Sequence, residues 1–319
     1  MSAPRVALIG ARRVRQGLGP FVARDLRAAG AEVPCFLVTR PESIEAAARG
    51  LREVAGLEAR GFVDLDELIA RETPDALAIL SPAETHAGIL EQAAAARLHV
   101  LCEKPFIWGE TRATARCREI LAGFEAGRRL VWENCQWPYA LPAFEALHPG
   151  GLDRPPGHFE MELQPVSRGL QSLADALPHP LSLLQALSPG EPKIRDVWFS
   201  TLSEHAESMS LGFVYEAGGR DTEVEIKLSS SETAPRRAAF CIDVLRAERL
   251  VSGADYQLSL ATADRSVPLA DPLTQLVADF VETLRSVSDE ARKLRARGIA
   301  QRMHLLMEIV SAYSREVRP

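Results

Sequence analysis

A lysine that precedes a proline, directly after an apolar segment, is the residue of this sequence best placed to do chemistry. Residues 99–106 read His-Val-Leu-Cys-Glu-Lys-Pro-Phe, so Lys104 stands where a buried strand would end. The pKa of a lysine ammonium falls when the group is desolvated, and such a lysine can transfer a proton to or from a substrate hydroxyl. The residue alone leaves a second interpretation open, in which Lys104 is a solvated lysine that follows a buried strand.

The first turn of the chain departs from the pattern that binds a dinucleotide. In G-x-G-x-x-G the glycines let the backbone approach a pyrophosphate, which then lies at a helix N-terminus. Here Gly10 is in register, Arg12 and Arg15 occupy the positions of the second and third glycines, and glycines return only at 17 and 19. Either the two arginines pair with cofactor phosphates, or the turn no longer binds a dinucleotide tightly.

The end of the second predicted strand bears on the choice of cofactor. An NAD site usually carries an acidic residue there for the ribose hydroxyls. This chain has Thr39 and Arg40 instead, and a guanidinium binds phosphate oxygens in a fork. We therefore expect NADP(H) in preference to NAD(H), with NAD(H) as the alternative cofactor. In the other interpretation Arg40 only caps a loop.

Strand and helix signals alternate over residues 1–135. Short apolar runs predict strands at 5–10, 32–38, 59–63, 75–80, 98–102 and 129–133. Helices are predicted between them, at 22–29, 43–55, 64–70, 83–96 and 111–126. Because such alternation implies right-handed crossovers, we expect an α/β fold that begins with a Rossmann domain, a doubly wound parallel sheet over residues 1–135.

From residue 136 onward the strands alternate polar and apolar residues. They are predicted at 158–163, 194–201, 208–215, 222–228 and 237–244. Helices are predicted at 142–147, 175–187, 272–286 and 290–315. Alternation of this kind is typical of antiparallel sheets with one solvated face. We expect residues 136–319 to form an α+β domain with a mostly antiparallel sheet that binds substrate and supports oligomerisation.

The composition excludes several classes of partner. With 46% hydrophobic and 25% charged residues the chain is typical of a globular protein, and its net charge of -6 argues against nucleic acid or an anionic membrane. We expect no signal peptide and no membrane span. The five cysteines lack a C-x-x-C pair, which favours reduced thiols in the cytoplasm over disulfides or a zinc site. No metal is expected, because the histidines and carboxylates lack ligand spacing.

Three segments together resemble the Gfo/Idh/MocA oxidoreductase family (glucose–fructose oxidoreductase, inositol dehydrogenase and relatives). They are Leu80-Ser-Pro-Ala-Glu-Thr-His86, the Glu-Lys-Pro of residues 103–105, and Asp175-Ala-Leu-Pro-His179 before an apolar helix. Their order and spacing are also similar to those of the family, and the resemblance covers essentially the whole chain. Two departures stand near the third segment, where Ser172 to Ala174 replace glycines and Pro178 replaces a small residue.

The resemblance implies roles for individual residues. Lys104, Asp175 and His179 would be catalytic, with His179 as acid or base beside the substrate carbinol, a role that a neutral imidazole suits. A helix-start histidine satisfied by backbone is the alternative for His179. The candidate cofactor-binding residues are Gly10, Arg12, Arg15, Thr39, Arg40, Ser81, Pro82, His86, Glu103, Lys104 and Asn134. Of these, His86 is expected to be structural or adjacent to the cofactor, and a cis peptide is compatible with Pro105.

Gln136, Tyr139 and Arg168 are the candidate substrate contacts, although Arg168 could equally be a solvated arginine. The function that we expect is hydride transfer between a nicotinamide and a sugar, cyclitol or related hydroxy or carbonyl compound. Two alternatives remain: a non-catalytic protein that senses a dinucleotide or ligand, and a lyase, hydrolase or epimerase that cycles its bound cofactor internally. The family likeness also implies a homo-oligomer formed through the sheet of the second domain.

Overall fold

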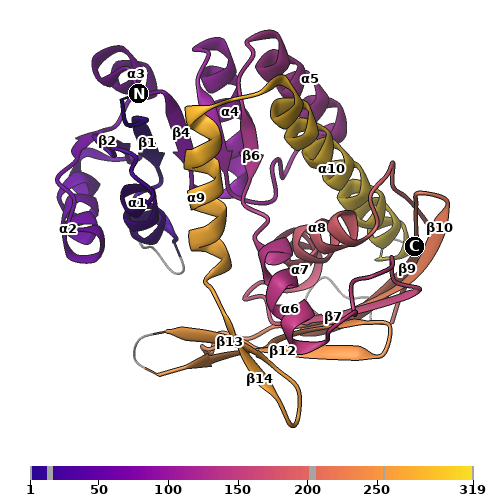
Figure 1. Cartoon of the computed structure of the whole chain (residues 1–319). Coiled ribbons are helices and arrows are strands. Elements are labelled where there is room, and N and C mark those ends of the chain that lie inside the picture. Colours follow the sequence, from indigo (N-terminus) through magenta and orange to yellow (C-terminus); the bar gives the residue numbers. More distant parts are fainter. Residues whose placement is uncertain (1, 13–16, 201–205, 254–255, 318–319) are drawn as a thin grey trace. The chain divides into compact units, whose positions relative to one another are not determined.

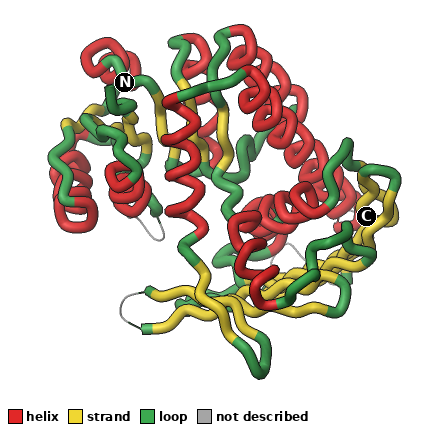
Figure 2. The backbone as a smooth tube through the Cα atoms, viewed as in Figure 1, coloured by secondary structure: helices red, strands yellow, loops and turns green. Residues whose placement is uncertain are grey.

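The structure, a computed structural model, describes residues 2–12, 17–200, 206–253 and 256–317. The chain divides into two units, the first made of Met1–Asn134 and Leu273–Ala300 and the second of Cys135–Pro272 and Gln301–Pro319. The predicted domains, 1–135 and 136–319, are contiguous, whereas the observed units are not, because residues 273–300 belong to the first. Figures 1 and 2 show the elements that make up each unit.

A six-stranded parallel sheet lies at the centre of the first unit. Its order is β3-β2-β1-β4-β5-β6, which is the doubly wound order of a Rossmann fold. The strands are β1 (Val6–Ile9), β2 (Cys35–Leu37), β3 (Arg60–Phe62), β4 (Ala76–Ile79), β5 (His99–Cys102) and β6 (Val131–Glu133). Every residue of β1, β4 and β5 is buried, as expected of parallel strands with helices on both faces. The structure confirms the predicted parallel sheet.

Five crossover helices connect these strands. They are α1 (Gly19–Ala28), α2 (Ile44–Ala55), α3 (Leu65–Glu72), α4 (His86–Ala95) and α5 (Ala113–Ala126), with short 3-10 turns η1 (Pro41–Ser43) and η2 (Ala83–Thr85). Local chemistry sets their ends. Pro20 lies in the first turn of α1, where its missing N–H costs nothing. The Asp64 carboxylate accepts a hydrogen bond from the Glu67 N–H at 2.7 Å and so caps α3.

Helix α9 (Pro272–Arg285) returns to the first unit because of its apolar face. Leu276, Val277 and Phe280 are fully buried, and the ring of Phe280 packs edge-on against Trp132 at 6.1 Å. At the end of the helix the Arg285 guanidinium donates to the Ala29 carbonyl oxygen at 2.9 Å. A long helix, α10 (Asp289–Val317), follows and has residues in both units. Sequence patterning predicts both helices but does not indicate which sheet α9 joins.

The second unit is built on an eight-stranded sheet of order β14-β13-β12-β11-β7-β10-β9-β8. All neighbours are antiparallel except β7 and β10, so the predicted mostly antiparallel sheet is confirmed. The strands are β7 (His158–Leu163), β8 (Lys193–Phe199), β9 (Ser208–Ala217), β10 (Arg220–Ser229), β11 (Ala238–Ile242), β12 (Leu245–Ser252), β13 (Gln257–Ala261) and β14 (Ser266–Leu269). The last three are not among the predicted strands, because β12 carries charges on both faces and β14 contains a proline.

The two faces of this sheet differ in chemistry. One face carries Phe159, Met161 and Phe240, which are buried, and it is covered by helices (Figure 1). These are η3 (Trp137–Ala140), α6 (Leu141–Leu147), α7 (Gly169–Ala176) and α8 (Pro178–Leu187). The other face carries paired charges, among them Lys227 with Glu160 at 2.9 Å. The alternation in sequence therefore corresponds to one apolar and one charged face.

The helix predicted over 175–187 is two helices in the structure. α7 ends at Ala176 and α8 begins at Pro178, because a proline has no N–H to donate back along the helix. Leu177 between them keeps helical dihedral angles, and its N–H donates to the Leu173 carbonyl oxygen at 2.9 Å. No helix among the described residues is long and apolar enough to cross a membrane.

Candidate functional site

Two glycines of the first turn are required by close backbone contacts. Gly10 has φ +90°, and a Cβ there would lie 2.7 Å from the backbone nitrogen of Ser81. A Cβ on Gly19 would lie 2.8 Å from the backbone of Ala11, so Gly19 lets α1 pack directly on the end of β1. That is the role of the third glycine in the dinucleotide pattern, displaced along the chain. Arg15 lies outside the described residues.

A group of polar and basic side chains lies where β1 and β2 end. The Arg12 guanidinium donates to the Ser43 hydroxyl at 3.0 Å, which joins the first turn to the segment after β2. Thr39 and Arg40 precede that segment and are exposed, as is Arg12. The structure thus brings three of the predicted residues to one edge of the sheet, the carboxyl edge at which doubly wound domains bind dinucleotides.

His86 connects the loop after β4 to the loop after β5. Its ring is completely buried, with Nε2 2.9 Å from the Ser81 carbonyl oxygen and Nδ1 3.0 Å from the Pro105 carbonyl oxygen. The Ser81 hydroxyl is in turn 2.7 Å from that of Thr85. The Thr85 hydroxyl also donates to the Pro82 carbonyl oxygen at 2.7 Å, so Ser81, Pro82 and His86 are held in one network with the Lys104–Pro105 turn. The Lys104–Pro105 peptide bond is cis, which agrees with the expectation for that proline.

Glu103 and Asn134 form a buried pair at the ends of β5 and β6. The Asn134 side-chain amide donates to the Glu103 carboxylate, and the Lys104 N–H donates to the other carboxylate oxygen at 3.3 Å. Burial raises the pKa of Glu103, while Lys104 and Asn134 lower it. The Asn134 carbonyl oxygen Oδ1 is buried and accepts no hydrogen bond from the described residues. An acceptor left in that state is available to a ligand amide or hydroxyl.

Glu133 is a residue of this network that sequence reasoning did not assign. Its carboxylate accepts a hydrogen bond from the Phe106 N–H at 3.0 Å, and the side chain is buried at the end of β6. Two carboxylates, Glu103 and Glu133, thus hold the backbone on either side of Lys104 and Pro105. The signal that could have found Glu133 is an acidic residue inside an otherwise apolar strand.

The remaining predicted catalytic residues lie in the second unit. The Asp175 carboxylate, at the end of α7, accepts a hydrogen bond from the Ser167 hydroxyl. His179 lies in the first turn of α8, and its ring packs against Trp137 with centroids 6.3 Å apart. Lys104 belongs to the first unit, so its approach to Asp175 and His179 stays a prediction.

The three candidate substrate contacts also lie in the second unit. Gln136 precedes η3, and its carbonyl oxygen accepts a hydrogen bond from the Tyr139 N–H at 3.1 Å. Both side chains are half-buried. Arg168 precedes α7 and pairs with Glu207 at 3.1 Å on the surface. Sequence reasoning did not single out Arg236 and Arg249, two arginines of the β11–β12 hairpin region whose pKa values are lowered, in each case chiefly by burial.

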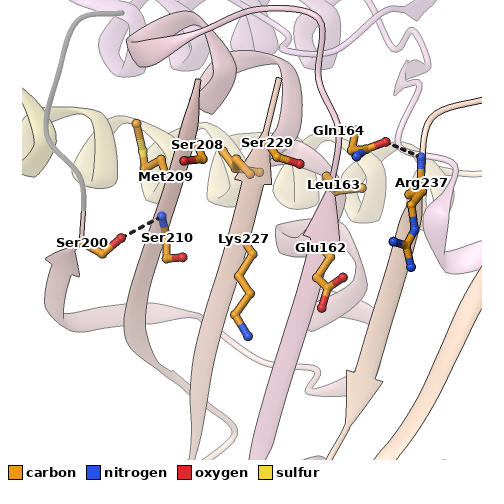
Figure 3. Close-up of a pocket in the computed structure, with 11 residues that line it drawn as sticks. Glu162, Leu163, Gln164, Ser200, Ser208, Met209, Ser210, Lys227, Ser229 and Arg237 are labelled. Atoms are coloured by element: carbon orange, nitrogen blue, oxygen red, sulfur yellow. Dashed lines mark hydrogen bonds between the residues drawn. The ribbon is translucent and has the colours of Figure 1, made fainter. Parts of the chain in front are cut away.

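A cavity of about 330 Å³ opens on the charged face of the second sheet (Figure 3). Its lining is rich in serine hydroxyls and includes Lys227, Glu162 and Arg237. None of the predicted site residues lines it. The charged side chains there are already paired, Lys227 with Glu160 and Arg237 with Glu248 at 3.1 Å. We therefore assign no part of the candidate site to this cavity.

The residues of the first unit fit a nicotinamide dinucleotide. Glycines at 10 and 19 let backbone segments approach closely after β1, Arg12 and Arg40 supply positive charge, and Asn134 supplies an unsatisfied buried acceptor. The positive charges suit a pyrophosphate and a ribose phosphate, and the amide acceptor suits the N–H groups of a carboxamide. The described residues contain no group of three or more His, Cys, Asp or Glu that could hold a metal ion.

The first part of the chain matches a known family model. Residues 4–132 match the family model GFO_IDH_MocA, described as "Oxidoreductase family, NAD-binding Rossmann fold". UDP-N-acetylglucosamine 3-dehydrogenase from Acidithiobacillus ferrooxidans is 30% identical over 168 residues, which are 51% of this chain and 51% of that protein. The match thus spans about half the length of this curated relative.

Solved structures share the fold over nearly the whole chain. The same Acidithiobacillus enzyme has a TM-score of 0.70 and 21% identity, covering 98% of each chain. A 3-ketoreductase from Actinomadura kijaniata in complex with NADP has a TM-score of 0.69 and 17% identity, covering 97% of each. An oxidoreductase from Agrobacterium radiobacter in complex with NAD+, L-tartaric acid and magnesium has a TM-score of 0.64 and 14% identity, again covering 97% of each.

Proposed function

We propose that this chain is a member of the Gfo/Idh/MocA oxidoreductase family, whose model its residues 4–132 match, and that it is an NAD(P)-dependent oxidoreductase acting on a sugar or related hydroxy or carbonyl compound. One observation carries the proposal. Lys104 follows β5 at the carboxyl edge of the Rossmann sheet, on a turn that His86, Glu103 and Glu133 fix by hydrogen bonds. Such rigid support is what a residue at a reacting centre requires.

We propose NADP(H) as the preferred cofactor. When bound, the nicotinamide supplies hydride donation and acceptance. Arg12 and Arg40 would hold the ribose phosphate, and Asn134 would accept a hydrogen bond from the carboxamide. The absence of an acidic residue at positions 39 and 40 supports this choice. Solved relatives include complexes with NADP and with NAD+, so relatives of this fold use both cofactors.

The chain's own residues would then move the proton. Lys104 would hold the reacting oxygen by its positive charge, and His179 would take the proton from, or return it to, the substrate hydroxyl. Asp175 would orient the histidine. Ser167 supports the Asp175 part of this proposal, because its hydroxyl already fixes that carboxylate.

A sugar substrate is supported by the names of relatives. The curated relative is a UDP-N-acetylglucosamine 3-dehydrogenase, and one solved relative is a 3-ketoreductase. We also propose that the protein acts in the cytoplasm, where its five free cysteines would stay reduced. A homo-oligomer formed through the charged face of the second sheet completes the proposal, and light scattering of the purified protein would test it.

The function is tested by incubating the protein with NADPH or NADP+ and a panel of sugars, cyclitols and their keto derivatives. Absorbance at the nicotinamide band reports net redox turnover, and product analysis reports any conversion that leaves the cofactor unchanged. We expect net oxidation or reduction of at least one compound. Tight cofactor binding without any turnover would favour a sensor, and product without net cofactor consumption would favour an enzyme that cycles the cofactor internally.

A further inference from the structure

Arg249 is a charged residue on the apolar face of the second sheet. Strand β12 places it directly opposite Ala238 of β11 and Leu260 of β13, on the same side as Ala247 and Phe240. All four of these residues are fully or almost fully buried. Neighbouring arginine Arg246 points to the other face, where it forms a bidentate pair with Glu162 at 3.1 Å. A guanidinium on the helix-covered side of a sheet is costly unless its charge is compensated.

The described residues compensate Arg249 only in part. Its Nη2 donates to the Arg236 carbonyl oxygen at 3.1 Å, and its guanidinium lies 5.4 Å from the centroid of Trp137. The Nε atom is buried and donates to no acceptor among the described residues. No carboxylate of those residues forms an ion pair with it. Burial lowers the pKa of Arg249 and the charge of Arg236 lowers it further, while Tyr256 and Asp271 act in the opposite direction.

A second guanidinium strengthens the positive charge of this region. Arg236 precedes β11, and its pKa is likewise lowered by burial, while Asp175 and Tyr256 act in the opposite direction. Two arginines that repel one another thus share a region with the carboxylate proposed to be catalytic. Trp137, which contacts Arg249, also packs against His179. The arginines therefore border the residues to which a substrate would bind.

We propose that Arg249, assisted by Arg236, binds an anionic group of the substrate, either a carboxylate or a phosphate. A guanidinium with an unsatisfied donor can donate hydrogen bonds to such oxygens in a fork, and the apolar surroundings of Arg249 strengthen the pair. The proposal rests on the proposed function, since it names the class of compound that the same site takes. A neutral sugar would leave the Nε donor of Arg249 without an anionic acceptor in the complex.

The test is isothermal titration calorimetry of the whole protein, which measures the dissociation constants of three probes. The probes are glucuronate, a nucleoside diphosphate (UDP) and neutral glucose. We expect one of the two anions to bind at least about tenfold more tightly than glucose, and the anion that does so identifies the source of the charge. Arg249→Gln should weaken that anion about 10- to 100-fold. Arg246→Gln, on the opposite face of the same strand, should change it less than about twofold.

A parallel titration with NADPH separates this inference from the proposed function. Arg249→Gln should leave the NADPH dissociation constant unchanged, and circular dichroism of the variant verifies its fold. If Arg249→Gln does not fold, Arg249→Lys, which keeps the charge but not the fork, should still weaken the anion severalfold. Equal binding of glucose and both anions, or equal effects at 246 and 249, would overturn the inference while NADPH binding stands. Failure of the wild type to bind NADPH would instead contradict the proposed function.

Discussion

The imidazole Nδ1 of His86 lies 3.0 Å from the carbonyl oxygen of Pro105. Because Nε2 of the same ring lies 2.9 Å from the Ser81 carbonyl oxygen, one buried side chain links the two loops that border the proposed cofactor site. A ring nitrogen that carries a proton donates to the carbonyl oxygen beside it, so the buried ring ties the two loops together.

Replacing His86 with phenylalanine should therefore affect both stability and catalysis. Two carbonyl oxygens would lose their contacts, and we expect a loss of about 2 kcal/mol in the free energy of unfolding. The turn that carries Lys104 would also lose its support, which should lower kcat/KM about 10- to 100-fold. Urea unfolding and steady-state kinetics measure the two effects. His86→Asn, which can still bond one carbonyl, should be intermediate, and a fully active His86→Phe would refute this positioning role.

Arg40 should govern the choice between the two cofactors. Its guanidinium is exposed beside the segment that Arg12 contacts through Ser43. Arg40→Gln should weaken NADP(H) about 10- to 30-fold and leave NAD(H) nearly unchanged, because only the former carries the extra phosphate. Fluorescence titration with NADPH and NADH measures both constants. Arg49→Gln, an exposed arginine of α2, is the matched control, and a parallel loss of both cofactors at position 40 would count against this role.

His99 should make the protein less stable at acid pH. It lies in β5, and burial, followed by the charge of Arg129, lowers its pKa to about 4 from an ordinary 6.5. Protonation therefore favours the unfolded chain, and the stability that the neutral ring contributes is lost as the pH falls from 6.5 through 4. The loss amounts to about 3 kcal/mol.

Urea unfolding at pH 7 and at pH 4 measures this contribution as a difference between proteins. His99→Asn, whose amide oxygen can still accept the hydrogen bond that Leu130 N–H donates at 2.8 Å, should lose less stability on acidification than the wild type. His304→Asn, at an exposed histidine, should behave as the wild type does. Identical pH dependence in all three proteins would show that His99 does not titrate in this range.

Much of this architecture can be predicted from sequence, and the exceptions have physical causes. The six short apolar runs predict the strands of the Rossmann sheet because parallel strands are buried throughout. Strand β12 is not predicted, because charged residues lie on both of its faces and its sequence does not alternate between polar and apolar residues. The membership of α9 in the first unit depends on Trp132 and Phe280 meeting across about half of the chain, which local patterning cannot show.

The residues of the candidate site also fall into two groups, those that the sequence predicts and those that it does not. Lys104, Glu103 and Asn134 can be predicted, because strand ends and a family resemblance mark them. Glu133 and Arg249 cannot, since their importance comes from burial and from the partners that the fold gives them. Gly19 differs from both groups. It is displaced along the sequence from the third glycine of the dinucleotide pattern, and only the close approach of the Ala11 backbone shows that it serves the same purpose.

The central claim is that Lys104 acts on the substrate beside a bound nicotinamide. The most direct test is the rate of hydride transfer in a single turnover, measured for the wild type, Lys104→Met and Lys293→Met, an exposed lysine of α10, with any substrate found in the panel. We expect Lys104→Met to bind NADPH within about fivefold of the wild type and to transfer hydride about 10²- to 10⁴-fold more slowly, with Lys293→Met unchanged. Hydride transfer at the wild-type rate in Lys104→Met would contradict the account.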